Sequence, residues 1–268
     1  MPVTAWGADN LNLSHIRNAD GPDVHFSTVR PPEIRVAASV EVHFQDLERL
    51  LIREIKAAQA VVGCMAWLTN ERILYALAKK EEVAIVVNKE DFLRPDKGGW
   101  SQEKIRQLYA SLKGSDRYTT GLFYSSGGDP TLEAIRCAGI HKDRRDIPPR
   151  MHHKFLVFCR IAKFETKQDE SDWRITTSKK EVDDYPEDWM CRPFPKHTHY
   201  STEYVPQAVW TGSFNATENG TRSLENAVII RDAAIASAYY QEWTNIQGIS
   251  EPLDWTSTYV EPEWRIGT

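Results

Sequence analysis

Two short apolar runs constrain the fold of this chain more than any other feature of its sequence. Residues 61–67 and 83–87 show no polar alternation, which is typical of strands buried on both faces of a sheet. Between them, residues 69–77 place apolar side chains at helical spacing behind a capping Thr69 or Asn70. A strand, a helix and a second strand in this order predict a βαβ unit, within a sheet that helices cover.

Other periodic segments add elements around this unit. Helical spacing predicts helices over 47–58, 105–112 and 235–243, and a shorter one from Leu132 that ends at Gly139. Strands are expected over 151–158, at the start of 209–215 and over 224–230, with short edge strands and loops within 1–40. No linker divides the chain into independent domains.

Composition excludes several protein classes. The 268 residues include 33 Lys and Arg against 38 Asp and Glu, a net charge of −5, with 41% hydrophobic and 26% charged residues. Disordered, collagen-like and coiled-coil chains do not have this composition. A mildly acidic protein does not coat nucleic acid with its whole surface, so any site for a polyanion must be a local patch.

The sequence predicts a soluble, cytoplasmic protein. No apolar run approaches the ~20 residues of a spanning helix, and the first residues lack a basic segment followed by an apolar one. The four cysteines form no CxxC pair, which favours free thiols over a disulfide framework. Cys191, His197 and His199, with Cys159, are an alternative metal-ligand set, but their spacing fits no standard zinc pattern.

The stretch 140–158, IHKDRRDIPPRMHHKFLVF, is the first candidate site, because it gathers positive charge in an acidic chain. Side chains alternate along a strand, so His152 and Lys154 share one face, where they suit a phosphate group, and His153 points to the other. For the other cations of this stretch there are two interpretations. Either they contact the backbone of a substrate, or they belong to a solvated loop. The candidates for substrate contact are Arg144, Arg145 and Arg150.

A second polar cluster lies in 209–215, VWTGSFN, where a strand runs into a turn. Ser213 and Asn215 share a face there, and both can donate hydrogen bonds to a phosphate oxygen, although both also suit a turn. Farther on, Glu225 could accept a hydrogen bond from one ring nitrogen of His152 and leave the other free to attack. The alternative for Glu225 is a solvated carboxylate.

Three motifs in this order, HxK, GSxN and a later glutamate, resemble the signature of the phospholipase D superfamily. The combination is far more specific than either short motif alone, and the resemblance extends over about residues 42–243. It implies an α/β fold, an α-β-α sandwich with a central mixed sheet flanked by helices. The matching motifs are His152-x-Lys154, Gly212-Ser213-x-Asn215 and Glu225-Asn226.

The resemblance also implies a phosphodiesterase that needs no metal and no other cofactor. His152 would attack phosphorus to form a phosphohistidine, and Glu225 would orient its ring. Lys154, Ser213 and Asn215 would stabilise charge on the phosphoryl oxygens. A second histidine must protonate the leaving group before water releases the phosphate from the enzyme.

The chain has one HxK and one GSxN, like family members with a single copy, which complete the site as homodimers. We therefore expect a homodimer with His152 of each copy at a shared site. One catalytic domain would span 1–268, with a core of about 40–246 and a C-terminal tail, 247–268, docked on it. An insertion at about 160–207 could be a lid, a substrate-selecting subdomain or a surface for a regulatory partner protein.

One motif position departs from the family pattern. Cys159 stands where the pattern has Asp, five residues after the lysine. The resemblance implies that this Asp has a structural role and is not the nucleophile. We therefore expect the protein to be active with Cys159 in its place.

The expected substrate is nucleic acid, with DNA favoured over RNA. Soluble single-copy members resemble nucleases, and the local charge before His152 suits a phosphate backbone. Phospholipid hydrolysis or transfer is the alternative activity, but no basic amphipathic segment supplies a contact with a membrane. A nucleic-acid-binding module that has lost its chemistry is the alternative from another class.

Overall fold

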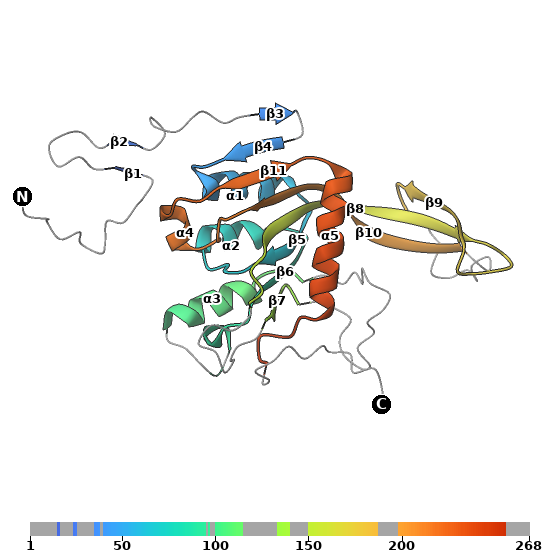
Figure 1. The fold of residues 1–268 in the computed structure, drawn as a ribbon. Helices are drawn as coiled ribbons and strands as arrows, with labels where there is room; N and C mark the ends of the chain where they lie inside the picture. The colour runs from blue at the N-terminus through green and yellow to red at the C-terminus, as the bar shows by residue number, and fades with distance from the viewer. Residues whose placement is uncertain are drawn as a thin grey trace, which may run out of the picture.

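The computed structural model describes residues 40–94, 96, 100–114, 133–139, 150–186 and 198–255, with three short strands before residue 40. A large mixed β-sheet forms the centre, and helices flank it (Figure 1). Its strands lie in the order β3-β4-β11-β10-β8-β5-β6-β7, and β9 pairs with β8 outside that row. The strands are β3 (Arg35–Ala37), β4 (Val40–His43), β5 (Ala60–Met65), β6 (Glu82–Asn88), β7 (Ile135–Ala138), β8 (Lys154–Gln168), β9 (Thr176–Val182), β10 (Thr198–Gly212) and β11 (Ala227–Ile230).

The predicted βαβ unit is confirmed. Strands β5 and β6 pair in parallel, and β7 adds a third parallel strand at the edge, whereas β8 joins β5 in the antiparallel direction. All residues of β5 and β6 are buried, as expected for central strands covered on both faces. A separate two-stranded sheet precedes this one, β1 (His15–Ile16) with β2 (Val24–His25).

Helices cover both faces of the sheet. One face packs against α1, α2 and α3, and the other against α5, which crosses the sheet in Figure 1. Asn70 caps α2 by accepting the Ile73 N–H at 3.0 Å, as the sequence predicted. The helices are α1 (Leu47–Ala57), α2 (Glu71–Leu77), the 3-10 helix η3 (Asp91–Leu93), α3 (Trp100–Ala110), α4 (Glu218–Arg222) and α5 (Ala233–Gly248).

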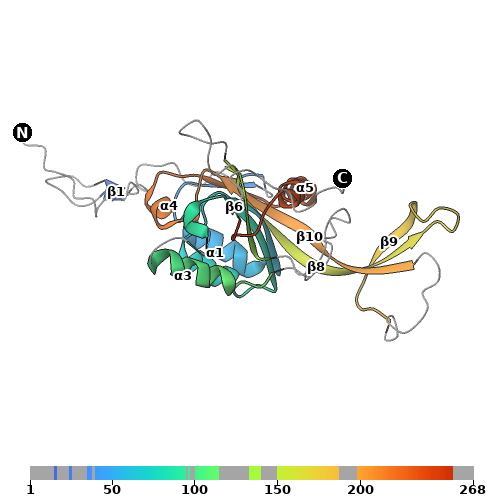
Figure 2. The ribbon, with the colours of Figure 1, turned by 90° about the horizontal axis from the view of Figure 1, so that it is seen from below.

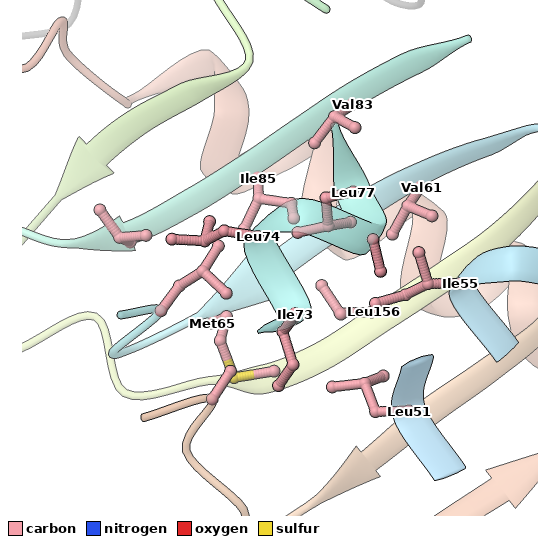
Figure 3. Close-up of a cluster of buried hydrophobic side chains, with 14 of the residues drawn as sticks. Leu51, Ile55, Val61, Met65, Ile73, Leu74, Leu77, Val83, Ile85 and Leu156 are labelled. Carbon is pink, nitrogen blue, oxygen red and sulfur yellow. The ribbon is translucent and has the colours of Figure 1, made fainter. Parts of the chain in front are cut away.

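The core between the sheet and α1 and α2 explains the apolar spacing of these helices. Leu51 and Ile55 of α1 pack in one cluster with Ile73 and Leu77 of α2 and with Val61 of the sheet (Figure 3). All five side chains are buried. Each buried side chain of this size contributes roughly 1.5–3 kcal/mol, so this layer fixes how the helices sit on the strands.

The helix predicted from Leu132 to Gly139 is wrong. Residues Ile135–Ala138 form strand β7, which pairs in parallel with the end of β6, and Leu132 lies outside the described residues. The segment is too short for the spacing of its apolar residues to distinguish a helix from a strand. It forms a strand because the edge of β6 is available for pairing. Ile135 and Cys137 point into one core layer and Ala138 into the other.

The insertion is an extension of the sheet. β8 and β10 continue their pairing from the core out to Lys167 and Thr198, and β9 pairs with the outer half of β8. The three strands form an arm that projects beyond the helices (Figures 1 and 2). Several of its cations pair with carboxylates, among them Arg160 with Glu181, Lys163 with Asp184 and Lys179 with Glu203.

In the part of the chain that the structure describes, no helix is both long and apolar enough to cross a membrane. The C-terminal segment that follows α5 packs on β6 and β7. Glu251 exchanges two backbone hydrogen bonds with Cys137, and its side chain pairs with the buried Lys89 at 2.5 Å. Trp255 is buried, with Lys89 over its ring at 4.5 Å. Residues 256–268 lie outside the described ranges.

Candidate active site

The strand register brings the sequence motifs to one edge of the sheet. Phe155 of β8 pairs with Thr211 of β10, so Lys154 and Gly212 come next along the same ladder. Gly212 in turn pairs with Ala227 at the start of β11, directly after Glu225 and Asn226. The carboxyl end of the parallel strand β5 reaches this edge too, because Met65 pairs with Lys154.

His152 and Lys154 lie side by side, as their spacing predicts. The Lys154 Nζ atom is 3.4 Å from Nδ1 and 3.2 Å from Nε2 of the His152 ring, and it also donates to the His152 carbonyl oxygen. Partial burial and the cations Lys154 and Arg150 hold the pKa of His152 below its usual range. The pKa of Lys154 is lowered by burial, which the charge of Glu225 opposes. The imidazole is therefore biased toward its neutral, nucleophilic form.

His153 points away from this pair, also as predicted. Its ring packs edge-on against Phe155 and lies 3.7 Å from the Glu242 carboxylate of α5. The two adjacent histidines thus serve opposite faces of the sheet.

Ser213 and Glu225 form a second pair at the same edge. The Ser213 hydroxyl donates a hydrogen bond to the Glu225 carboxylate and accepts one from the Asn226 N–H at 3.0 Å. Glu225 therefore accepts from Ser213 in this structure and not from the ring of His152, which differs from the expected contact. A hydroxyl has one proton, so Ser213 cannot donate to a phosphate oxygen while it donates to Glu225.

Gly212 is required by the close approach of two strands. Its φ is +154°, and a Cβ atom there would lie 2.3 Å from the Asn226 carbonyl oxygen. No larger residue fits without shifting β11. The glycine of the GSxN motif therefore sets the distance between the Ser213 turn and the strand after Glu225.

Asn215 lies in the turn after β10, where its backbone carbonyl accepts from the Thr217 N–H at 2.8 Å. Its Oδ1 atom is buried and has no hydrogen-bond partner among the described residues. A buried amide oxygen without a partner is uncommon and costs free energy. The turn also carries Ala216, whose carbonyl accepts from Thr69 and Asn70 and joins this edge to the start of α2.

Of the three candidate arginines, only Arg150 falls within the described residues. Its guanidinium lies 3.3 Å from Glu90 and 5.9 Å from the centre of the Trp67 ring. Arg144 and Arg145 belong to 141–149, outside the described ranges.

The alternative metal-ligand set is not assembled by its described members. Cys159 is buried in the apolar layer under α5, and burial raises the pKa of its thiol. The His199 ring lies on the arm, 2.9 Å from Gln168. Cys159 pairs with Pro206 of β10, and His199 lies seven residues before Pro206 on the same strand. The two candidate ligands, Cys159 and His199, are therefore about 23 Å apart. Cys191 and His197 lie outside the described residues.

Sequence reasoning missed three residues at this edge, Trp67, Asn88 and Glu90. Trp67 packs edge-on against His152, with ring centres 5.3 Å apart, and Asn88 accepts a hydrogen bond from the Met151 N–H at 3.1 Å. All three lie at or just beyond the ends of β5 and β6. The carboxyl ends of parallel strands commonly form sites, so the predicted βαβ unit carried the signal that could have found them.

Comparisons with known proteins give distant similarities. No protein-family model matches the chain. The uncharacterized protein L381 of Acanthamoeba polyphaga mimivirus is 25% identical over 237 residues, covering 82% of this chain and 69% of that protein. Nuc, a phospholipase D family member from Salmonella typhimurium, is 16% identical with a TM-score of 0.41, covering 80% of this chain and 98% of Nuc. NucT from Helicobacter pylori is 11% identical with a TM-score of 0.41, at the same coverage of each chain. A functional assignment therefore rests on the site itself.

Proposed function

We propose that this protein is a metal-independent phosphodiesterase that cleaves nucleic acid. The observation that carries the proposal is the contact of Lys154 with the ring of His152, at the sheet edge that also holds the Ser213–Glu225 pair. A neutral imidazole beside an ammonium group suits attack on an anionic phosphodiester, because the cation attracts the phosphate and disfavours protonation of the nucleophile.

The reaction proceeds in two steps. A ring nitrogen of His152 attacks phosphorus, a P–N bond forms, and the bond to the leaving oxygen breaks. Lys154 and Arg150 stabilise the charge on the non-bridging oxygens, and Asn215 contributes a further hydrogen bond. Water then attacks the phosphohistidine and gives a proton to the group that protonated the leaving oxygen. The P–N bond breaks, and the phosphate product leaves with the free imidazole restored.

The leaving oxygen needs a proton, and the proposal assigns this proton to His152 of a second copy of the chain. HxK occurs once in the sequence, so a homodimer supplies the second imidazole. Glu225 orients the site through Ser213. The two cations that lie beside His152, Arg150 and Lys154, support a nucleic-acid backbone as the substrate, and within that class we favour DNA over RNA.

The test is cleavage of labelled single- and double-stranded DNA and RNA in excess EDTA. His152→Ala removes the proposed nucleophile, and His153→Ala is the matched control, because the neighbouring ring lies on the other face. We expect cleavage by the wild type and by His153→Ala, and a loss of at least a thousandfold in His152→Ala. Cleavage that persists in His152→Ala would contradict the proposal. Phosphatidylcholine vesicles in a parallel assay separate nuclease from phospholipase activity.

A further inference from the structure

One carboxylate oxygen gathers three donors from three segments beside the proposed nucleophile. Oε1 of Glu90 accepts from Asn88 Nδ2 at 2.7 Å, from Trp67 Nε1 at 3.3 Å and from Arg150 Nη1 at 3.3 Å. Trp67 follows β5, Asn88 ends β6, and Arg150 precedes β8. The oxygen thus fastens the ends of three neighbouring strands.

The three donors also lie next to His152 or to the residue that precedes it. Trp67 touches the His152 ring edge-on, and the charged ends of Arg150 and Lys154 lie 5.9 Å and 5.7 Å from the centre of its indole ring. Both distances fall within the range of cation–π contacts, which attract the indole ring to the two charges. The Oδ1 atom of Asn88 accepts a hydrogen bond from the N–H of Met151, the residue before the proposed nucleophile His152.

A carboxylate is an unfavourable neighbour for an anionic substrate, so its presence at this edge requires a compensating role. Glu90 is partly buried, with 25% of its side chain exposed, and its charge is directed at Arg150. Among the described residues, it forms no hydrogen bond or ion pair with Lys154 or with the ring of His152. Its role is thus to hold the groups around the nucleophile and not to contact the phosphate.

We propose that Glu90 is a positioning residue, which fixes Trp67 and Arg150 against His152 so that the ring and the guanidinium are preorganised for one phosphate. This inference rests on the proposed phosphodiesterase function. Because a single oxygen accepts all three hydrogen bonds, a glutamine, which keeps an amide oxygen at that place, preserves the arrangement. An alanine removes it.

The experiment compares Glu90→Ala and Glu90→Gln with Glu103→Ala. Glu103 is a matched control, because its exposed carboxylate on α3 also accepts from an arginine and an amide, Arg106 and Gln107. With bis(p-nitrophenyl) phosphate as the probe, kcat should fall about tenfold to a hundredfold in Glu90→Ala, since small displacements of reacting groups have effects of this size. Glu90→Gln should restore kcat to within about threefold of the wild type, and Glu103→Ala should change it less than twofold.

A second readout does not depend on activity. The nuclear Overhauser effect between the His152 ring, identified by its absence in His152→Ala, and the Trp67 indole should weaken in Glu90→Ala and persist in Glu90→Gln. An unchanged effect in Glu90→Ala, an unchanged kcat in that variant, or a Glu90→Gln variant as impaired as Glu90→Ala would each overturn the inference. If the wild-type protein cleaves nothing, the proposed function fails, and the Overhauser effect alone still tests whether Glu90 positions the ring.

Discussion

The Ser213 hydroxyl is held by two adjacent residues just before β11, because it donates to the Glu225 carboxylate and accepts from the N–H of Asn226. The Ser213 N–H also donates to the Asn226 carbonyl at 3.1 Å. The GSxN turn and the start of β11 are therefore fastened by the residues that the motifs assign to chemistry. The same hydrogen bonds that place Ser213 and Glu225 at the site therefore also stabilise the fold.

The coupling between Ser213 and Glu225 is measurable. A hydrogen bond to a charged, partly buried carboxylate contributes about 1.5–3 kcal/mol, so Ser213→Ala should lower the free energy of unfolding by this amount. A double-mutant cycle with Glu225→Ala, followed by urea denaturation, should give a coupling energy of about 1–2 kcal/mol. Ser171→Ala is the control, because its hydroxyl donates to Asp169 at an exposed position on the arm. Strictly additive effects of Ser213→Ala and Glu225→Ala would show that the contact contributes nothing.

The titration of His152 should respond to Lys154. Burial and the Lys154 charge lower the pKa of His152 from its ordinary value of 6.5, so Lys154→Met, which keeps an apolar stem, should raise the pKa of His152. Histidine with a lowered pKa binds fewer protons in the folded than in the unfolded state. Stability is therefore lost as the pH falls from about 6.5 through the lowered pKa of the folded state, and this loss should be smaller in Lys154→Met. NMR titration of the His152 ring checks the direction, with Lys163→Met on the arm as the control. A lower pKa of His152 in Lys154→Met would refute this prediction.

Most of the central strands and part of the candidate site could be predicted from the sequence. Residues 61–65 and 83–87 lie in buried strands as predicted, because a segment that is apolar throughout suits a strand covered on both faces, whereas Trp67 at the end of the first run lies beyond β5. The alternation expected over 151–158 was enough to put His152 with Lys154 and His153 on the other face, although β8 begins only at Lys154. These features depend on local spacing, which a single sequence displays.

Features that depend on distant partners could not be predicted. Whether Ile135–Ala138 is a helix or a strand depends on the free edge of β6, about fifty residues earlier in the chain. Glu225 was expected on His152, but the close approach at Gly212 brings it to Ser213 instead. Glu90 carries no motif, and its role emerges only when the ends of β5, β6 and β8 meet.

Cys159 should not be replaceable by the family aspartate. It lies five positions from Lys154 along β8, about 16 Å, and its side chain is buried with Val157 and Tyr204 in the apolar layer under α5. A carboxylate there would lose its hydration, so Cys159→Asp should lower the free energy of unfolding by about 2–4 kcal/mol. Cys159→Ala should cost about 1 kcal/mol, because only a small cavity results. Chemical denaturation and phosphodiester cleavage measure both effects, and a Cys159→Asp protein that is both stable and more active would contradict the argument.

The arm should be dispensable for cleavage of a small phosphodiester. Its described strands extend from the end of β8 opposite to Lys154, so they do not form a lid over the site of their own chain. Ala162 pairs with Glu203 about 26 Å from Lys154, and a two-residue Asn-Gly turn can close the two strands at this point. The variant that lacks residues 163–202 should fold and hydrolyse bis(p-nitrophenyl) phosphate within about twofold of the wild-type rate, because the shortened strands keep every core pairing. A large rise in activity would support a restraint imposed by the insertion, and a large loss in a folded variant would place the arm at the site of a second copy.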